Sequence, residues 1–457
     1  MTETMPRPDQ QELLEHLPLD FMQMRVFARD PYVVEGGDGI RIQDVDGKVY
    51  IDGLAGVFTV SVGHGNRAVI EAVTEQLHRN AFAPPLHGTN PRALELAALL
   101  RTITPPGLKS FKFISGGSEA CEAALKLARQ YHIQTGHARK YKVIAAYGSY
   151  HGATMGALSA TGGWERKSVF EPLLGGYLHV HPAYCYRCPY DQQYPGCGLT
   201  CARLIERTIL AEDPETVSAV ILNPVSVNAS GLMIPPPEYY REVRAACDRH
   251  NVVLIFDEVI TGFGRLGTMF GCEYYGVVPD MIACGKGMSG GYAPLAAVIF
   301  ADRIQAAFLG EEADRLEFHH GHTYGGNPVA CAAGIAATRQ IIERNLVENA
   351  RRVGAYLHAR LQELAERYSI IGEVRGAGLL QGIEFVRDRA TRAPFTGSPR
   401  PGKLIDRFAR ERGLILRCGS DFIALAPPLI VTESDVDTIV AILDESIGLT
   451  QRALVGA

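Results

Sequence analysis

Apolar residues recur along this chain with two different periods, and the two patterns alternate over most of its length. Over residues 119–132, EACEAALKLARQYH repeats its apolar residues at the three- and four-residue spacing of an amphipathic helix. Between such helical patterns lie short apolar runs that predict buried strands: VSAVIL, VVLIF, DMIAC and LAAVIF. The alternation, from about residue 68 to 342, predicts a mostly parallel sheet with helices on both faces.

The two ends of the chain follow a different pattern. IRIQDVDGKVYIDGL, residues 40–54, predicts a strand, an Asp-Gly turn and a second strand. Residues 345–368 predict a long amphipathic helix, GLLQGIEFV a further strand, and the chain from Glu433 onward a last helix. With 457 residues the fold class is expected to be α/β, with a large, doubly wound domain over 67–342. A small α+β domain is expected from both chain ends, 1–66 and 343–457.

Composition and charge narrow the class of protein. Hydrophobic residues make up 47% and charged residues 21%, and the net charge of −5 gives no general attraction to nucleic acid or anionic membranes. The N-terminal segment lacks the basic and apolar regions of a secretory signal, and no apolar run approaches the ~18 residues of a membrane span. We therefore expect a cytoplasmic protein without nucleic-acid or membrane partners, whose cysteines stay reduced.

Two segments carry residues that suit cofactor chemistry. In NVVLIFDEVITGFGRLG, Asp257 follows an apolar strand, where doubly wound sheets bind ligands, although a structural ion pair or a helix cap would look the same. In PDMIACGKGMSGGYAPLAAVIF, Lys286 lies among glycines, which is equally the pattern of a surface lysine in a turn. Together they match pyridoxal 5′-phosphate, which needs a lysine for its aldehyde and a carboxylate for its pyridine nitrogen.

The phosphate of that cofactor has a candidate site in FISGGSEACEAALKLAR. Ser115, Gly116, Gly117 and Ser118 precede a helix, and the free N–H groups and dipole of a helix start favour phosphate. A Gly-Ser pair is also a common plain N-cap. Neither Gly-Lys-Ser/Thr nor a G-x-G-x-x-G after a strand is present, which disfavours a nicotinamide-dependent dehydrogenase.

Taken in order, these motifs resemble the class III pyridoxal-phosphate aminotransferases of fold type I. SGGSEA is similar to their phosphate-binding loop, YGSYHGAT to their ring-stacking segment, and VRGAGLLQGIEF to a strand of their small domain. HTYGGNPVACAA resembles the segment that reaches the phosphate of the neighbouring subunit. The chain departs from the pattern at Gly116, where a serine is usual. The resemblance implies a homodimer with active sites at the subunit interface.

The resemblance also implies roles for single residues. Lys286 and Asp257 match the catalytic pair, the Schiff-base lysine and the partner of the pyridinium nitrogen. Tyr150 and Val259 would pack on opposite faces of the cofactor ring, and Thr323 would reach the neighbouring subunit. The cofactor-binding residues implied in this way are Gly117, Ser118, Tyr150, His151, Asp257, Val259, Lys286 and Thr323.

Three features favour the ω-amino acid or amine:pyruvate branch of the family. Arg417, in LRCGSDFIALAPPL, resembles a mobile arginine that pairs with a substrate carboxylate. In 2-oxoglutarate-using relatives such as 4-aminobutyrate and ornithine aminotransferases, a glutamate holds this arginine aside. The matching position in this chain is about Asn228, so that carboxylate is missing here. Phe58 would line an apolar substrate pocket with Tyr150 and residues 82–87, unless it belongs to the core.

The expected activity is transamination from an ω-amino acid or primary amine to a 2-oxo acid, with pyruvate as the expected acceptor. Alanine and an aldehyde or ketone would be the products. A 2-oxoglutarate-dependent enzyme or an aminomutase of the same fold would share the cofactor motifs. A metal-stabilised, non-catalytic binding protein is the alternative from another class. The sequence leaves the amine donor open.

One further stretch, YCYRCPYDQQYPGCGLTC, holds four cysteines: Cys185, Cys188, Cys197 and Cys201. The spacing C-x2-C-x8-C-x3-C permits a structural zinc site with four thiolates, but its gaps differ from those of common zinc ribbons. A reduced loop packed by tyrosine and proline ranks ahead of it, so no metal is expected. A similar segment occurs in the taurine:pyruvate aminotransferase subgroup, which favours pyruvate as the acceptor.

Overall fold

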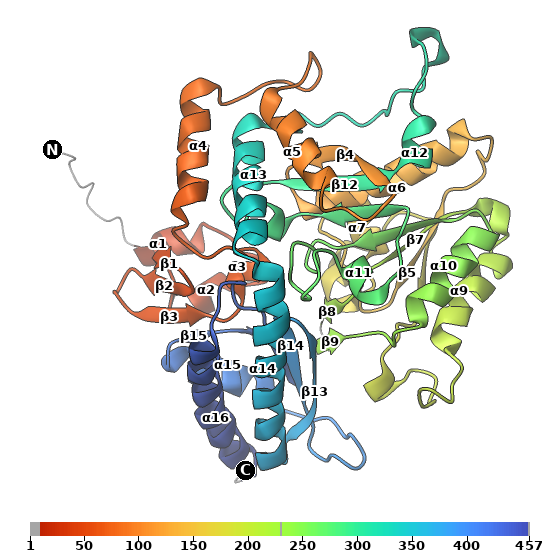
Figure 1. Ribbon diagram of the computed structural model, residues 1–457. Coiled ribbons are helices and arrows are strands. Elements are labelled where there is room, and N and C mark those ends of the chain that lie inside the picture. Colours follow the sequence, from red (N-terminus) through yellow and green to blue (C-terminus); the bar gives the residue numbers. More distant parts are fainter. Residues whose placement is uncertain (1–9, 229–230, 456–457) are drawn as a thin grey trace.

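A seven-stranded sheet forms the centre of the protein, in a computed structural model that describes residues 10–228 and 231–455 (Figure 1). Its strand order is β4-β12-β11-β10-β7-β5-β6. β12 pairs antiparallel with both of its neighbours, whereas β11, β10, β7, β5 and β6 run parallel, which confirms the predicted sheet. The strands are β4 Leu108–Ile114, β5 Lys142–Ala146, β6 Tyr177–Val180, β7 Val217–Leu222, β10 Val253–Asp257, β11 Met281–Cys284 and β12 Ala296–Ala301.

Both faces of this sheet are buried, as its continuous apolar runs require. Side chains alternate across a strand, so neighbouring residues of β10 belong to different hydrophobic clusters. Leu254 and Phe256 lie in the larger cluster, and Val253 and Ile255 in the smaller one, which α6 covers. The main helices are α4 Arg67–Arg79, α5 Pro91–Arg101, α6 Gly117–Gln134, α9 Thr200–Ala211, α10 Tyr239–Arg249, α13 Pro328–Glu343, α14 Leu346–Arg367, α15 Pro401–Glu411 and α16 Glu433–Val455.

Shorter elements fill the connections. The short helices are α1 Gln10–Glu15, α2 Met24–Phe27, α3 Ala55–Phe58, α7 Met155–Ala160, α8 Trp164–Lys167, α11 Gly271–Tyr275 and α12 Asp302–Ala306. A two-stranded ribbon consists of β8 Ser226–Asn228 and β9 Gly231–Met233. Within the part of the chain that the structure describes, no helix combines the length and apolar character that crossing a membrane requires.

The two ends of the chain meet in one region. β1 Val34–Asp38, β2 Arg41–Asp44 and β3 Val49–Asp52 pair antiparallel, and β15 Leu414–Ile415 adds to β3 in parallel. Figure 1 shows the red N-terminal strands beside the blue C-terminal helices. A further sheet, in the order β13-β14-β17-β16, comprises β13 Ile371–Ala377, β14 Leu380–Phe385, β17 Phe422–Leu425 and β16 Arg417–Cys418. The predicted hairpin at 40–54 is confirmed, while the exact domain boundaries stay a prediction.

Candidate active site

The candidate site lies at one edge of the seven-stranded sheet. Tyr150 and His151 follow β5, Asn223 follows β7, and Asp257 ends β10. The carboxyl ends of parallel strands meet at the same edge, which is where open α/β sheets bind ligands. The fold therefore brings together residues that are far apart in the sequence.

Lys286 follows β11 at the start of a 3-10 turn, Lys286–Met288. Its φ of +44° lies in the left-handed region, which costs a non-glycine residue of order 1–3 kcal/mol. Burial, supported by the positive charge of Arg417, lowers the pKa of the Lys286 amine to about 8. The nearby carboxylate of Asp257 acts in the opposite direction and raises this pKa. The amine is thus partly neutral near neutral pH, which is the form that attacks a carbonyl group.

Asp257 is 4% exposed, and several hydrogen-bond donors hold its carboxylate. His151 Nδ1 lies 2.8 Å from Oδ2, and Asn223 Nδ2 donates to the same oxygen at 3.0 Å. The backbone N–H of Val259 donates to Oδ1 at 3.1 Å. These contacts fix the carboxylate in one orientation at the edge of the sheet.

A buried thiol completes the surroundings of this carboxylate. The donor atoms of Cys121, His151 and Asp257 lie within 4.8 Å of one another. Burial, together with Asp257, raises the pKa of Cys121 well above its usual range, so the thiol stays protonated and is a donor toward the carboxylate.

The start of α6 offers an anion site beside these groups. Its N-cap, Gly116, provides no side-chain hydrogen bond, so the first N–H groups of the helix lack a capping side chain. A Cβ on Gly117 would lie 2.9 Å from Val259, and one on Gly152 would lie 2.6 Å from Ser118 Oγ. Glycine at both positions therefore permits the close packing of Gly117 on Val259 and of Gly152 on Ser118.

Aromatic and guanidinium groups line the approach to Lys286. The Phe58 ring is 4% exposed, and its centroid lies 5.3 Å from Lys286 Nζ, so Phe58 is both a core residue and a neighbour of the amine. The guanidinium carbon of Arg166 lies 5.7 Å from the centroid of the Tyr150 ring. Burial, together with the charge of Arg166, lowers the pKa of Arg417. Arg417 acts electrostatically on Lys286 and Arg166 acts on Arg417, and such a pair of guanidinium groups suits an anionic ligand.

Three buried polar atoms of the site have no hydrogen-bond partner among the described residues: His151 Nε2, Asn223 Oδ1 and Arg417 Nε. Buried polar atoms without partners are uncommon, and a cluster of them points to a missing polar ligand. Lys286, Asp257 and the uncapped helix supply the amine, carboxylate and anion site of a pyridoxal 5′-phosphate site. The residues present therefore fit that cofactor.

Comparison with known proteins decides the family. The family described as aminotransferase class III matches residues 25–447. The chain belongs to the class III aminotransferases. It is 39% identical over 431 residues to adenosylmethionine-8-amino-7-oxononanoate aminotransferase of Nitratidesulfovibrio vulgaris. The aligned residues cover 93% of this chain and 79% of the relative. Diaminobutyrate–2-oxoglutarate transaminase of Halomonas elongata is 35% identical over 433 residues, covering 92% of this chain and 91% of the relative.

A solved structure agrees with this assignment. An amine transaminase from an uncultivated Pseudomonas species, in its PLP-bound form, superposes with a TM-score of 0.90 at 35% identity, covering 95% of this chain and 98% of that one. The predicted fold type I is therefore confirmed. Class III aminotransferases use pyridoxal 5′-phosphate, so the predicted cofactor and the predicted enzyme class are confirmed as well, and the non-catalytic alternative falls away.

Some residues that the sequence placed in the site of this aminotransferase are exposed on the surface of the single chain. Thr323 is exposed in the loop before α13. Phe82 packs on Tyr324 with ring centroids 5.7 Å apart, and Leu86 is 87% exposed. The role predicted for Thr323 toward a neighbouring subunit and the substrate pocket predicted for residues 82–87 both stay predictions.

The loop predicted to distinguish acceptors is described in part. Asn228 ends β8, and its backbone pairs with Gly231 of β9. Ala229 and Ser230 lie outside the described residues, as do residues 1–9 of the predicted N-terminal segment. The interpretation that rests on Asn228 therefore stays a prediction.

The structure adds three residues that the sequence reasoning missed: Cys121, Arg166 and Asn223. Cys121 lies three positions after Ser118, one turn along the same helix, so helical spacing alone would have found it. Asn223 directly follows the strand-like run VSAVIL, which is also a local signal. Arg166 lies in α8, within GGWERKS, where nothing in the sequence points to the site.

Proposed function

We propose that this aminotransferase moves an amino group from an ω-amino acid or a primary amine to pyruvate, giving alanine and an aldehyde or ketone. One observation carries this proposal. Arg417 Nε is buried without a partner among the described residues, and the guanidinium acts electrostatically on Lys286. A guanidinium that is free to pair lies near the reactive amine, as a substrate carrying a carboxylate requires.

The chain's own residues support the following steps. When bound, pyridoxal 5′-phosphate supplies an aldehyde that condenses with amines and a ring that accepts an electron pair. Lys286 would hold the aldehyde carbon of the cofactor, and its Nζ would take the proton from the carbon that bears the donor's amino group. Asp257, which His151 and Asn223 orient, would keep the ring nitrogen protonated.

Other residues bind and position. The N–H groups at Gly117 and Ser118, which have no side-chain cap in competition, would bind the phosphate. Tyr150 and Val259 would hold the ring between them. Arg417 pairs with the carboxylate of pyruvate and swings away when a donor lacks one.

The acceptor is tested by separated half-reactions. Enzyme that has been aminated by a donor is mixed with pyruvate or with 2-oxoglutarate, and return of the aldehyde form is followed by absorbance. The proposal predicts faster return with pyruvate, and formation of alanine. Faster return with 2-oxoglutarate and formation of glutamate would contradict it.

A 2-oxoglutarate acceptor is the second candidate, because the structure places Arg166 close to Arg417. Two guanidinium groups suit two carboxylates. If this candidate holds, Arg166→Gln weakens the apparent binding of 2-oxoglutarate in steady-state kinetics and leaves that of pyruvate unchanged. Arg139→Gln is the matched control, since Arg139 is an exposed arginine paired with Asp213.

We also propose a homodimer with shared active sites and keep the cytoplasmic location as a prediction. The exposed Tyr324 packs on the exposed Phe82, and Thr323, Leu86 and further apolar side chains of α4 and α5 are exposed as well. Exposed apolar side chains that a second subunit would cover support this proposal. Light scattering of the purified protein measures the mass in solution, and a monomer at working concentration would contradict the proposal.

A further inference from the structure

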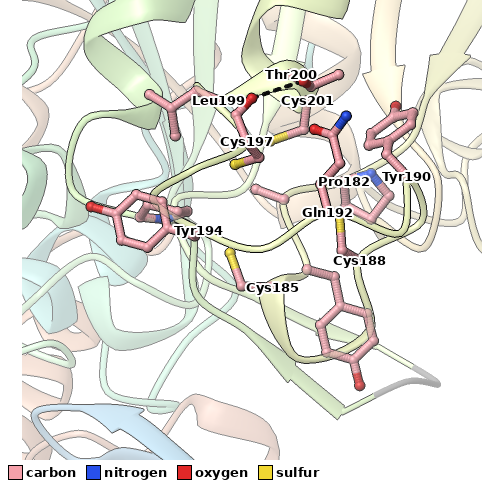
Figure 2. Close-up of a pocket in the computed structure, with 13 residues that line it drawn as sticks. Pro182, Cys185, Cys188, Tyr190, Gln192, Tyr194, Cys197, Leu199, Thr200 and Cys201 are labelled. Carbon is pink, nitrogen blue, oxygen red and sulfur yellow. Dashed lines mark hydrogen bonds between the residues drawn. The ribbon is translucent and has the colours of Figure 1, made fainter.

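The four cysteines of the segment 185–201, here called the cysteine loop, surround one small cavity. Figure 2 shows the sulfur atoms of Cys185, Cys188, Cys197 and Cys201 around it. The cavity measures about 20 Å³, the room of one ion or one water molecule rather than of a substrate. Cys185 is close enough to interact electrostatically with Cys188 and Cys197, and Cys201 with Cys185 and Cys197. All four thiols are free.

The lining of this cavity is suited to a soft metal ion. Apart from the four thiols it consists of uncharged residues: Pro182, Ala183, Tyr184, Tyr190, Gln192, Tyr194, Leu199, Thr200 and Pro236. No acidic or basic side chain among the described residues lines it, so a charged species in the cavity would have the sulfur atoms as its ligands. Thiolate ligands select zinc over the hard cations that prefer oxygen.

The loop itself has little regular structure to hold it. Residues 181–199 connect β6 to α9 and contain one 3-10 turn, Cys185–Arg187. Connections of more than ~15 residues with so little regular structure are uncommon in a compact domain. Cys201 lies in the first turn of α9, so one ligand would be anchored in a helix. The Arg203 guanidinium lies 3.4 Å from the carbonyl oxygen of Cys197, where it would counter the negative charge of a tetrathiolate site.

This loop connects the large sheet with the sheet that carries Arg417. Tyr184 Oη donates to Glu384 on β14, and Arg187 Nε donates to the same carboxylate at 2.5 Å. On the other side, Tyr194 Oη donates to Glu238 at 2.8 Å, next to α10. β14 belongs to the same sheet as β16, and Arg417 is the first residue of β16. A fixed loop therefore helps to fix the position of Arg417.

We propose that the cysteine loop binds one zinc ion through Cys185, Cys188, Cys197 and Cys201, as a structural site that fixes this connection. Four thiols each release a proton to solvent as four zinc–sulfur bonds of about 2.3 Å form, and no oxidation is involved. Four protein ligands leave no open position, so the ion has no part in transamination.

Binding draws the sulfur atoms closer together. The described residues hold one set of three metal-ligating side chains with donor atoms within 4.8 Å, and that set is Cys121, His151 and Asp257. No three sulfur atoms of the loop therefore lie within 4.8 Å of one another, so some of them are farther apart than the ~3.8 Å that tetrahedral geometry with ~2.3 Å bonds requires. Cys185, Cys188 and Cys197 lie outside the α-helices, whereas Cys201 belongs to α9, so the first three are expected to move toward Cys201.

The test measures metal bound to the PLP-loaded enzyme. The enzyme is purified under reducing conditions without chelator, and zinc is determined by mass spectrometry. We expect one zinc ion per chain, loss of it in Cys188→Ser/Cys197→Ser, and full retention in the matched control Cys418→Ser, a half-buried thiol outside the loop. Zinc that persists in the double variant would place the ion elsewhere, for example at Cys121, and would overturn the proposal.

A second measurement needs no variant and so does not depend on the folding of one. The unmodified enzyme is stripped of metal and reconstituted with Co²⁺ under reducing conditions. A tetrathiolate site gives intense sulfur-to-cobalt charge-transfer bands and tetrahedral d–d bands, with one Co²⁺ per chain. Absence of these bands, or absence of stoichiometric metal, would overturn the proposal while leaving the proposed transamination intact.

Discussion

The site around Lys286 and the cysteine loop follow carboxyl ends of strands of the same sheet, but they assemble in opposite ways. The four thiols come from one segment, 185–201, and are neighbours in the sequence before the chain folds. The candidate site residues Lys286, Asp257 and His151 lie at the ends of three different strands and meet because those strands are parallel. In the first region proximity is local, and in the second it is a consequence of the sheet.

This difference predicts that damage to one region leaves the other intact. The largest effect is expected for Lys286→Ala, because no other amine among the described residues is placed to bind the cofactor aldehyde and to move the proton. Transaminase turnover should fall by at least about 10⁴-fold. The zinc content and the melting temperature should stay close to those of the unmodified enzyme. Lys109→Ala, at an exposed lysine, is the control, and full turnover of Lys286→Ala would end the proposed mechanism.

A smaller loss is expected when the carboxylate-binding group is removed. Arg417→Gln should raise the KM of pyruvate by about 10- to 100-fold, since a hydrogen bond to a charged group contributes about 1.5–3 kcal/mol. The KM of a donor without a carboxylate should stay unchanged, because such a donor makes no use of the guanidinium. Steady-state kinetics with a primary amine and pyruvate measures both values. Equal changes in the two KM values would remove Arg417 from the carboxylate site.

In the cysteine loop, the expected effect is on stability rather than on chemistry. Cys188→Ser/Cys197→Ser should lower the melting temperature of the PLP-loaded enzyme, because the connection between β6 and α9 loses its cross-link. The kcat per folded, loaded chain should change by less than about tenfold, far less than in Lys286→Ala. Differential scanning fluorimetry measures the melting temperature, and steady-state kinetics measures kcat. An unchanged melting temperature would contradict the structural role.

The smallest effect is a shift in pH dependence. The pKa of Lys286 is lowered from the ordinary 10.5 to about 8, so the amine is increasingly neutral as pH rises through 8. Cofactor uptake by the cofactor-free enzyme should therefore rise about tenfold per pH unit below pH 8 and level off above it. Arg417 lowers this pKa, so Arg417→Gln should move the curve to higher pH. Stopped-flow absorbance measures the rates, and a shift to lower pH would contradict the assignment.

The same lysine gives a linked effect on folding of the cofactor-free enzyme. Between about pH 8 and 10.5 the unfolded chain holds a proton on Lys286 that the folded chain lacks. The contribution of Lys286 to the free energy of unfolding therefore rises with pH in this window. Below pH 8 the lysine is charged in both states, and its burial costs stability.

The sequence alone was informative where local pattern and function coincide. The apolar runs located the strands to within a residue, since β7 is Val217–Leu222 as predicted and β10 is Val253–Asp257, one residue later than the predicted run. The motifs around Lys286, Asp257 and Ser118 were sufficient to predict the family and its cofactor. A buried strand needs apolar side chains on both faces, and a phosphate needs free N–H groups, so each leaves a local trace.

Contacts between distant segments were decided by the tertiary structure. Arg166 lies in a short helix without any motif, yet it comes close enough to Arg417 to lower its pKa. The sequence favoured a metal-free loop over a zinc site, because the gaps between its cysteines differ from those of common zinc ribbons, and spacing alone does not show where the thiol side chains point. Folding turns the four thiols toward one cavity and leaves Arg417 Nε without a partner in the part of the chain described. Sequence determines which groups are available, and only packing determines which of them face one another and which stay unpaired.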